Sequence, residues 1–187
     1  GPEGQAGVRD RGRVMGRGGG GVQGAVAGGA GGRWALLGAE GDQAAALAEA
    51  SGAGEVCTVA NDNAPGQVVL SGHTGAIERA VASVKEHGIK RGMLLPVSAP
   101  FHCPLMQPAA DAMAQALEQT PPGALHVTLM ANVTAAPVTD PAEVRRLLVE
   151  QVTGRVRWRE SMIALGAAGV THFVELGGKV VGPMIAR

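Results

Sequence analysis

The spacing of apolar residues between positions 34 and 97 alternates between strand-like runs and helical periodicity. Four short apolar runs predict strands: 34–39, 56–60, 67–70 and 90–97. Between them, apolar residues recur with helical spacing over 42–51 and 74–87. Asp42 has the chemistry of an N-cap, and Gly88 that of a helix stop. The pattern predicts six elements in the order β-α-β-β-α-β.

The polar stretch 61–66 separates the second and third predicted strands and consists largely of turn-forming residues. Residues 56–70 are therefore expected to form a hairpin with a long loop. The order β-α-β-β-α-β is the split βαβ, or ferredoxin-like, pattern. We expect an α/β fold in which residues 34–97 form a ferredoxin-like subdomain.

A second unit is expected over residues 98–187, where strands again alternate with helices. Its predicted elements are helices at 104–119, 141–152, 158–168 and from about 182 onward, and strands at 127–130 and 170–176. Asp140 is followed by a proline and, three residues later, by an acidic residue, which is the pattern of a capped helix start. Alternating strands and helices predict a parallel α/β layer.

Residues 1–33 differ in composition from the rest of the chain. They contain 14 of the 30 glycines and five arginines, and they lack aromatic residues. They show neither strand nor helix periodicity, so they bury too little surface to offset the entropy of ordering. We interpret this segment as disordered, as the product of a shifted reading frame, or as a divergent insertion.

The overall composition argues against several classes of protein. Sixteen basic and sixteen acidic side chains leave no net charge to attract nucleic acid or an anionic membrane. No apolar run approaches the roughly 18 residues that span a bilayer, and the N-terminus lacks the apolar segment of a secretory signal. Two cysteines, Cys57 and Cys103, do not form a disulfide framework and suit a reducing cytoplasm.

Judged from its position in the sequence, His102 is the strongest candidate for a catalytic residue. It follows an apolar predicted strand in a loop between Pro100 and Pro104, and α/β proteins carry reactive groups on such loops. A histidine held there can act as a general base, and the alternative is a buried histidine with a structural hydrogen bond. No Gly-x-Ser-x-Gly nucleophile motif occurs in the sequence. No histidine or cysteine pair has the spacing of a metal site, so no metal is expected.

Three segments together form a specific motif set. In chain order they are Asn61-Asp-Asn-Ala-Pro-Gly-Gln-Val-Val-Leu-Ser-Gly-His73, Leu95-Pro-Val-Ser-Ala-Pro-Phe-His-Cys-Pro-Leu-Met106 and Glu175-Leu-Gly-Gly-Lys-Val-Val-Gly-Pro-Met184. Their sequence, order and spacing resemble the bacterial malonyl-CoA:acyl-carrier-protein transacylase family of fatty-acid synthesis. The resemblance extends from about Trp34 to Arg187, which is most of the chain.

The resemblance implies a fold, a reaction and partners. The family has a larger α/β-hydrolase-like subdomain with a ferredoxin-like subdomain inserted in it, so residues 98–187 would be the C-terminal part of the larger one. The implied reaction is ping-pong transfer of malonyl from malonyl-CoA to the phosphopantetheine thiol of an acyl carrier protein. It uses a histidine-activated serine in a Gly-His-Ser-x-Gly motif. No further cofactor is implied, and a cytoplasmic monomer is expected for the intact protein.

The resemblance also implies roles for individual residues. By its motif, His102 corresponds to the catalytic histidine. Gln151 aligns where a backbone carbonyl orients that histidine in the family. Phe101 resembles the malonyl-type residue that helps to set acyl size, and Asn61 and Asn63 of the first motif are expected to bind substrate.

The start of the chain departs from the family pattern. Arg11-Gly-Arg-Val-Met15 resembles the context of the arginine that holds the malonyl carboxylate, but the residues that follow do not match. In the family, the nucleophilic serine and a Gly-Gln-Gly oxyanion motif precede that arginine. The chain is therefore expected to be an N-terminally truncated fragment that is inactive by itself. The alternatives are an inactive remnant that binds acyl-CoA or carrier protein, and a piece of a polyketide synthase acyltransferase domain.

Overall fold

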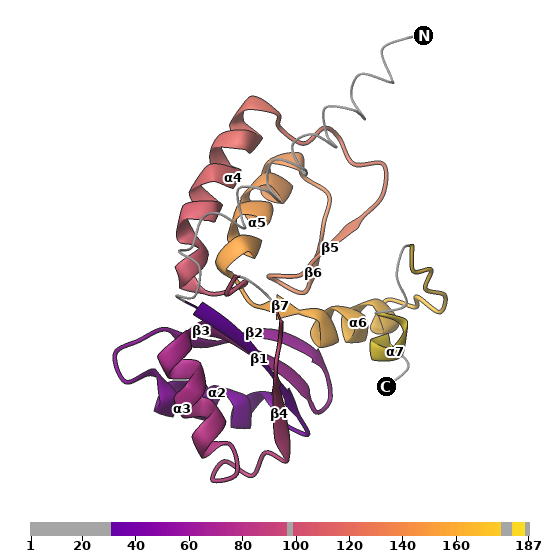
Figure 1. Ribbon diagram of the computed structural model, residues 1–187. Coiled ribbons are helices and arrows are strands. Elements are labelled where there is room, and N and C mark those ends of the chain that lie inside the picture. Colours follow the sequence, from indigo (N-terminus) through magenta and orange to yellow (C-terminus); the bar gives the residue numbers. More distant parts are fainter. Residues whose placement is uncertain (1–30, 97–98, 177–180, 186–187) are drawn as a thin grey trace.

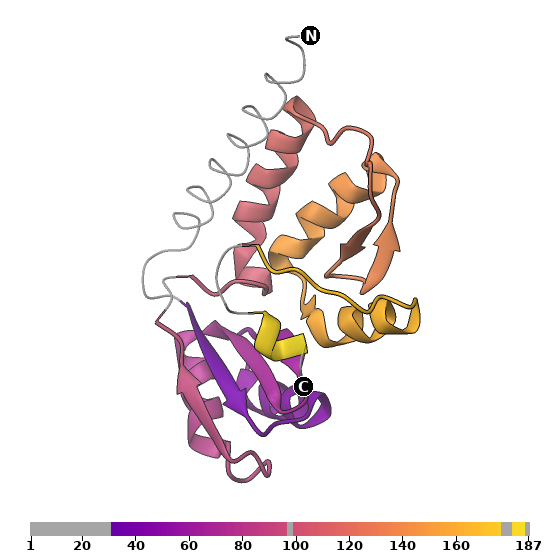
Figure 2. The ribbon, with the colours of Figure 1, turned by 90° about the vertical axis from the view of Figure 1, so that its right-hand side faces the viewer.

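The computed structural model describes residues 31–96, 99–176 and 181–185. Two lobes lie one above the other in Figure 1, and the turned view of Figure 2 separates them as well. One lobe holds a sheet and two helices. The other is built around two long helices and a small hairpin. Most of the Gly/Arg-rich segment, including Arg11, lies outside the described residues.

The first lobe confirms the predicted order β-α-β-β-α-β. Its elements are β1 (Gly31–Leu37), α2 (Gly41–Gly52), β2 (Cys57–Ala64), β3 (Gln67–His73), α3 (Thr74–Ser83) and β4 (Arg91–Leu94). The strands lie in the order β4-β1-β3-β2, with antiparallel neighbours throughout. A fifth strand, β7 (Val156–Arg157), comes from the other end of the chain and pairs with β2 in parallel. The sheet is therefore mixed.

Helices α2 and α3 cover one face of this sheet (Figure 1). Side chains alternate between the two faces of a strand, so Trp34 and Leu36 of β1 point to the same side as Val68 and Leu70 of β3. They pack with alanine, leucine and isoleucine side chains of the two helices to form the main apolar core. The opposite face carries the alternate positions of the same strands, and Ser71 on that face lies near the Cys103 thiol.

The hairpin of β2 and β3 differs from the predicted long loop. Strand β2 continues through the polar residues up to Ala64, and Ala64 pairs with Gln67 across a turn formed by Pro65 and Gly66. Two irregularities in the pairing allow the polar stretch to remain in the sheet. Gly66 has a φ of +73°, a conformation that glycine adopts without steric cost.

The start of α2 is also corrected. Glu40 is its N-cap residue, and the side-chain oxygen of Gln43 accepts a hydrogen bond from the Glu40 backbone N–H at 3.0 Å. Asp42, the predicted cap, lies in the first turn of the helix instead. There, its negative charge suits the positive end of the helix dipole. Helix α3 is followed by turns rather than continuing to residue 87.

The second lobe contains the remaining elements. They are the short 3₁₀ helix η1 (Pro104–Met106), α4 (Gln107–Gln119), β5 (Leu129–Ala131), β6 (Ala136–Val138), α5 (Pro141–Thr153), α6 (Trp158–Ala167) and α7 (Gly182–Ile185). Asp140 caps α5 as predicted, accepting hydrogen bonds from the backbone N–H groups of Ala142 and Glu143. Helices α4 and α5 lie side by side, and a cluster including Val144 and Leu147 packs α5 against the β5–β6 hairpin.

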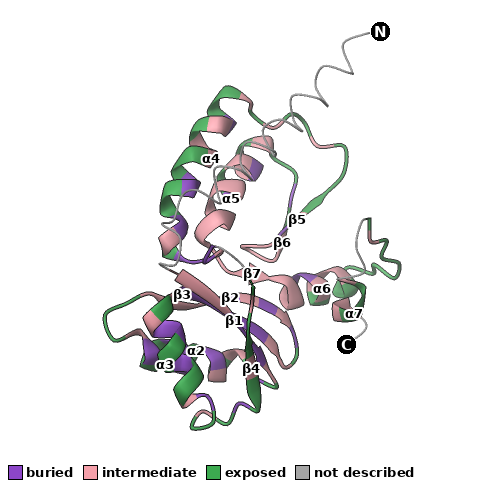
Figure 3. Ribbon diagram, viewed as in Figure 1, coloured by how far each residue is buried: buried purple, intermediate pink, exposed green. Residues whose placement is uncertain are grey.

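The predicted parallel layer of this lobe is wrong for the residues that the structure describes. Strands β5 and β6 pair with each other in antiparallel fashion, and residues 170–176 form no strand. A strand needs a neighbour for its backbone hydrogen bonds, and none of the described strands lies beside that segment. Figure 3 shows it as largely exposed, and the exposed fraction of Leu176 is 91%.

No helix within the described ranges has the length and apolar character needed to cross a lipid bilayer.

Candidate active site

His102 lies on a loop that its neighbours hold tightly. Ala99 and Met106 are buried at its two ends and pack with Ala109 of α4 in a small apolar cluster. Within the loop, the buried thiol of Cys103 donates a hydrogen bond to the carbonyl oxygen of Pro100 at 3.0 Å. His102 itself has a φ of +62°, a left-handed conformation that costs a non-glycine residue free energy and is common at functional sites.

The imidazole of His102 is oriented by the end of α5. Its Nδ1 lies 2.9 Å from the backbone carbonyl oxygen of Gln151. The last carbonyls of a helix have no partner within the helix, so Gln151 offers an acceptor that the chain must satisfy from elsewhere. Val152, the next residue, packs against the apolar cluster under the loop and fixes the helix end beside the histidine.

This hydrogen bond decides which ring nitrogen of neutral His102 carries the proton. A carbonyl oxygen only accepts, so Nδ1 must donate, and Nε2 keeps its lone pair. The side-chain amide of Gln151 lies 3.4 Å from Nδ1 and 3.5 Å from the carbonyl oxygen of Gly154, to which it can donate. A neutral histidine in this tautomer is poised to remove a proton through Nε2.

Burial lowers the pKa of His102, and the nearby Arg33 guanidinium lowers it further. The backbone carbonyls of Gln151 and Gly154 act in the opposite direction, because they favour the charged ring, but burial outweighs them. The lowered pKa favours the neutral form of the imidazole.

We expect an NMR titration of the full chain to give His102 an apparent pKa below the ordinary histidine value of about 6.5. The unfolded chain then binds a proton that the folded chain does not, so this group lowers stability as pH falls from about 6.5 to the folded pKa. Above pH 6.5 the full stability remains. The resonance is assigned with His102→Ala. A His102 pKa at or above the ordinary histidine value of about 6.5 would contradict the prediction.

The sheet face beside this loop carries two further polar residues. Arg33 of β1 and Asn61 of β2 lie on either side of β3, and the guanidinium of Arg33 donates from Nη2 to the side-chain oxygen of Asn61. The Arg33 guanidinium also lies 5.9 Å from the centre of the Phe101 ring, a cation–π distance. Arg33 thus connects the sheet to the residue preceding His102.

The loop rests closely on β1 and β3 at this point. A Cβ atom at Gly31 would lie 2.6 Å from Cγ of Pro100, so only glycine permits this approach. Ser71, directly opposite Arg33 in the β1–β3 pairing, is fully buried and lies near the Cys103 thiol. Burial raises the pKa of that thiol, which makes Cys103 a poor nucleophile.

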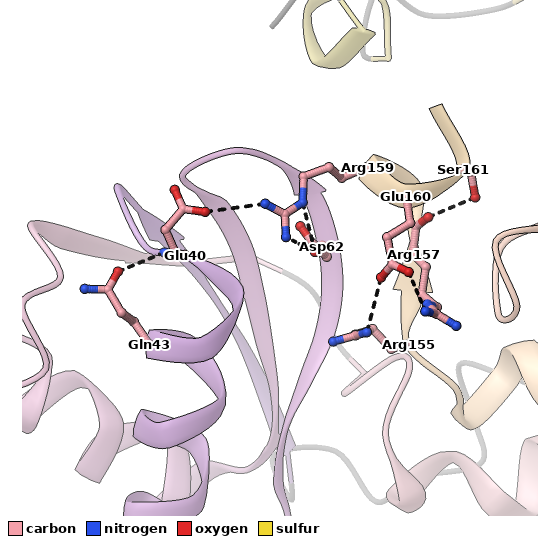
Figure 4. A network of polar contacts seen from close by, with 8 residues as sticks. All are labelled: Glu40, Gln43, Asp62, Arg155, Arg157, Arg159, Glu160 and Ser161. Carbon is pink, nitrogen blue, oxygen red and sulfur yellow. Dashed lines mark hydrogen bonds and ion pairs between the residues drawn. The ribbon is translucent and has the colours of Figure 1, made fainter. Parts of the chain in front are cut away.

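A polar network ties the two lobes together next to the site (Figure 4). The guanidinium of Arg159, on α6, contacts Oδ2 of Asp62 at 2.8 Å from Nη2 and at 3.2 Å from Nε. The same arginine reaches Glu40 at 3.4 Å. The side chain of Asp62 is only 4% exposed, whereas that of Arg159 is 28% exposed.

Strand β7 completes this connection. Val156 pairs with Asn61 and Arg157 with Asp62, directly after the end of α5. The parallel pairing of β7 with β2 thus brings the end of α5, with the Gln151 carbonyl that orients His102, near Asn61, which accepts the hydrogen bond of Arg33. Arg155 and Arg157 both contact Glu160 at the start of α6 (Figure 4).

The structure brings together four of the six site residues predicted from the sequence. His102, Gln151, Phe101 and Asn61 converge as described. Asn63 lies farther along β2, is half-buried, and has no polar contact with them in the described part of the chain. Arg11 lies outside the described residues. Among the described residues, no cluster of histidine, cysteine or acidic side chains could hold a metal ion.

Sequence reasoning did not identify Arg33, which belongs to the end of the Gly/Arg-rich segment by composition. The sequence feature that could have identified Arg33 is its position directly before the apolar run that starts at Trp34. A charged residue that extends a strand at this point shares a face with alternate residues of the neighbouring strand.

Comparison with known proteins gives a consistent set of relatives. No protein-family model matches the chain. It is 42% identical to the malonyl CoA-acyl carrier protein transacylase of Salmonella typhimurium over 167 residues, which are 89% of this chain and 54% of that protein. It is 39% identical to the protein of the same name from Bacillus subtilis over 135 residues, 72% of this chain and 43% of the relative.

Solved structures agree with these relatives. The acyl-carrier-protein S-malonyltransferase of Bartonella henselae has a TM-score of 0.91 and 45% identity over 95% of this chain and 57% of its own. A malonyl-transacylase solved in complex with a type II polyketide synthase acyl-carrier protein has a TM-score of 0.90 and 33% identity over 94% of this chain and 57% of its own. The chain spans about half the length of the curated relatives it matches.

Proposed function

Over the length that it spans, the chain belongs to the malonyl-CoA:acyl-carrier-protein transacylase family, and on this premise we propose that it carries the general base for malonyl transfer. The transfer runs from malonyl-CoA to the phosphopantetheine thiol of an acyl carrier protein, in fatty-acid synthesis. The observation that carries the proposal is the hydrogen bond from His102 Nδ1 to the carbonyl of Gln151, which leaves Nε2 free to accept a proton.

The proposed mechanism uses His102 in both halves of the reaction. Nε2 takes the proton of a serine hydroxyl as its oxygen attacks the malonyl thioester, and the Gln151 carbonyl stabilises the imidazolium. Nε2 then protonates the departing coenzyme A thiolate. In the second half it takes the proton of the carrier's thiol, the thiolate displaces the serine oxygen, and the proton returns to serine. The sequence contains no Gly-His-Ser-x-Gly motif, so this mechanism takes its nucleophile from outside the 187 residues.

The remaining site roles are part of the same proposal. Phe101, in cation–π contact with Arg33, shapes the space for the acyl group. Asn61 acts near the site by holding Arg33, and Asn63 stays a predicted substrate contact on the motif alone. Arg11 remains the predicted partner of the malonyl carboxylate by resemblance. No cofactor beyond the two thiol carriers takes part, and a cytoplasmic monomer without nucleic-acid or membrane partners is proposed for the intact protein.

We assign the two lobes to the two subdomains of this family. The strand order β4-β1-β3-β2 with two helices on one face supports a ferredoxin-like subdomain over residues 34–97. Residues 98–187 then form the C-terminal part of the α/β-hydrolase-like subdomain, and residues 1–33 precede both.

The test is a hybrid enzyme in which this chain replaces the aligned part of the Salmonella typhimurium relative. We expect the hybrid to transfer malonyl from malonyl-CoA to a phosphopantetheinylated carrier protein, and the 187-residue chain by itself to transfer none. A folded hybrid that binds malonyl-CoA without transferring it would favour the inactive binding remnant. Preference for another acyl group would favour a polyketide synthase acyltransferase.

A further inference from the structure

The bend that carries His102 is closed by a side chain rather than by a backbone hydrogen bond. Pro100 and Cys103, on either side of the bend, are fully buried, and the Cys103 thiol donates to the Pro100 carbonyl oxygen at 3.0 Å. Among the described residues, no other donor reaches this carbonyl. A buried carbonyl needs a donor, because it has lost its hydrogen bonds to water. The thiol therefore fills a requirement of the folded chain.

The same thiol is held from the side of the sheet by Ser71 of β3. Ser71 is fully buried, and its hydroxyl oxygen has no hydrogen bond of standard geometry to the described residues. Burial raises the pKa of the Cys103 thiol, and the nearby Ser71 hydroxyl lowers it less strongly. The thiol thus keeps its proton and remains a donor. Because a carbonyl only accepts, the S–H points to Pro100, and the Ser71 hydroxyl can face the sulfur as a donor.

His102 lies inside this closed bend in a conformation that needs support. Its φ of +62° is left-handed, which costs a residue with a Cβ atom free energy and persists only where surrounding contacts hold it. The contact between Cys103 and Pro100 restrains the backbone on both sides of His102. Pro100 in turn rests against Gly31, where a Cβ atom would lie 2.6 Å from its Cγ. The backbone of His102 decides where its ring points, and Nδ1 lies 2.9 Å from the Gln151 carbonyl oxygen.

We propose that Cys103 is a positioning residue for His102: its thiol closes the bend at Pro100, keeps His102 left-handed and thereby aims Nδ1 at the Gln151 carbonyl. Ser71 keeps the thiol in place from β3. The consequence for catalysis rests on the proposed function, whereas the effect on the ring of His102 does not. If Cys103 only filled space, its size would matter and its hydrogen-bond donor would not.

The experiment compares Cys103→Ala with Cys103→Ser in the full chain. NMR spectra that correlate imidazole nitrogens with ring protons show which nitrogen of neutral His102 carries the proton, and the one-bond Cα–Hα coupling reports the sign of φ. We expect Cys103→Ala to lose the preference for Nδ1–H and the positive φ. Cys103→Ser replaces the S–H donor by an O–H donor, so it should retain both. A Cys103→Ala chain in which both are unchanged overturns the proposal, and so does equal loss in the two variants.

Two further variants serve as controls. Cys57→Ala removes the other thiol of the chain, which lies on β2 and packs against the core of the first lobe, and should leave the His102 spectrum unchanged. Cys103→Val fills the buried space without supplying a donor, so it should act as Cys103→Ala does. If neither donor-free variant folds, the S–H infrared band of Cys57→Ala decides, because Cys103 is then the only thiol. A band at the frequency of a thiol without a hydrogen bond overturns the proposal.

Kinetics of the hybrid enzyme separate this inference from the proposed function. Cys103→Ala should lower kcat roughly 10- to 100-fold, the scale on which misplacing a catalytic group acts, and leave KM for malonyl-CoA unchanged. Cys103→Ser should keep kcat near that of the unsubstituted hybrid. If the unsubstituted hybrid is inactive but the spectra change as expected, the positioning role stands and the proposed function fails. If the hybrid is active and Cys103→Ala keeps both its kcat and the Nδ1 proton, the function stands and the positioning role fails.

Discussion

His102→Ala is expected to lower kcat for malonyl transfer by the hybrid roughly 10²- to 10⁴-fold, the range over which a positioned general base acts. The imidazole is the one described group with a hydrogen-bonded Nδ1 and an available Nε2 at this site. Its removal leaves the loop in place, because Ala99, Met106 and Cys103 hold the loop independently of the ring. The unfolding midpoint should therefore change little.

Two readouts separate a catalytic role of His102 from a structural one. Added imidazole should partly restore transfer by His102→Ala, because it can occupy the vacated space and accept the proton. In the hybrid that retains His102, kcat/KM should rise with pH through the lowered pKa of His102 and be level above pH 6.5, and the variant should lose this rise. His126→Ala, which removes an exposed histidine, is the control. A His102→Ala hybrid that transfers malonyl at the same rate as the control would remove His102 from the mechanism.

Arg159→Met is expected to lower the free energy of unfolding by about 3 kcal/mol, the lower end of the range for breaking a buried ion pair. The reason is the carboxylate left behind. Asp62 is 4% exposed, its Oδ2 would lose both hydrogen bonds, and its Oδ1 is already buried without a partner. We take the lower end because Arg159 is partly exposed and the pair retains some solvent contact.

Urea unfolding of the full chain measures this loss, provided that the m-value stays constant. Glu40→Gln is the matched control, because Glu40 contacts the same arginine at 3.4 Å but is 61% exposed, so its loss should be below about 1 kcal/mol. Adding Asp62→Asn to Arg159→Met should recover part of the stability, since the stranded charge is then gone. If Arg159→Met and Glu40→Gln lowered the free energy of unfolding equally, the contact between Arg159 and Asp62 would stabilise the fold no more than the exposed contact with Glu40 does.

Local signals in the sequence predicted the first lobe well. These signals are the apolar runs around Trp34 and Val68 and the helical spacing near Ile77, and each involves only residues close together in the sequence. The structure confirms the order of elements that they predict. The same holds for Asp140, whose cap needs only the next three residues. The boundaries were less accurate, because strand pairing rather than composition decides where β1 and β3 begin and end.

Distant partners explain what the sequence did not predict. Asp62 belongs to a run that is typical of a turn. Its backbone pairing with β3 and β7 makes it part of a strand, and its contact with Arg159 accounts for the buried carboxylate. Strand β6 was missed because Ala136–Val138 is short and contains a proline. Residues 170–176 have the apolar character of a strand, but a strand forms only beside another strand, and that neighbour is not a property of the segment itself.

The residues of the candidate site also fall into two groups, those that the local sequence identified and those that depend on distant contacts. The motif around His102 identified the residue and, through the resemblance, its partner Gln151. It did not identify Arg33, because the contacts with Asn61 and Phe101 arise from sheet register and loop packing. Asn63 follows Asn61 by two positions in the motif, yet the irregular pairing of β2 leaves it without a polar contact to the other site residues in the described structure.

The link between Asp62 and Arg159 has a consequence for the order in which the chain assembles. Its two residues are 97 positions apart, whereas the strand pairs among β1, β2, β3 and β4 close within one compact stretch of the chain. During synthesis the first four strands can pair early, but Asp62 has no Arg159 until the ribosome has passed residue 159. Contacts over long separations form late because loop closure costs entropy. A nascent chain that stops before β7 therefore presents a sheet whose β2 edge is unpaired and whose buried acid lacks its cation.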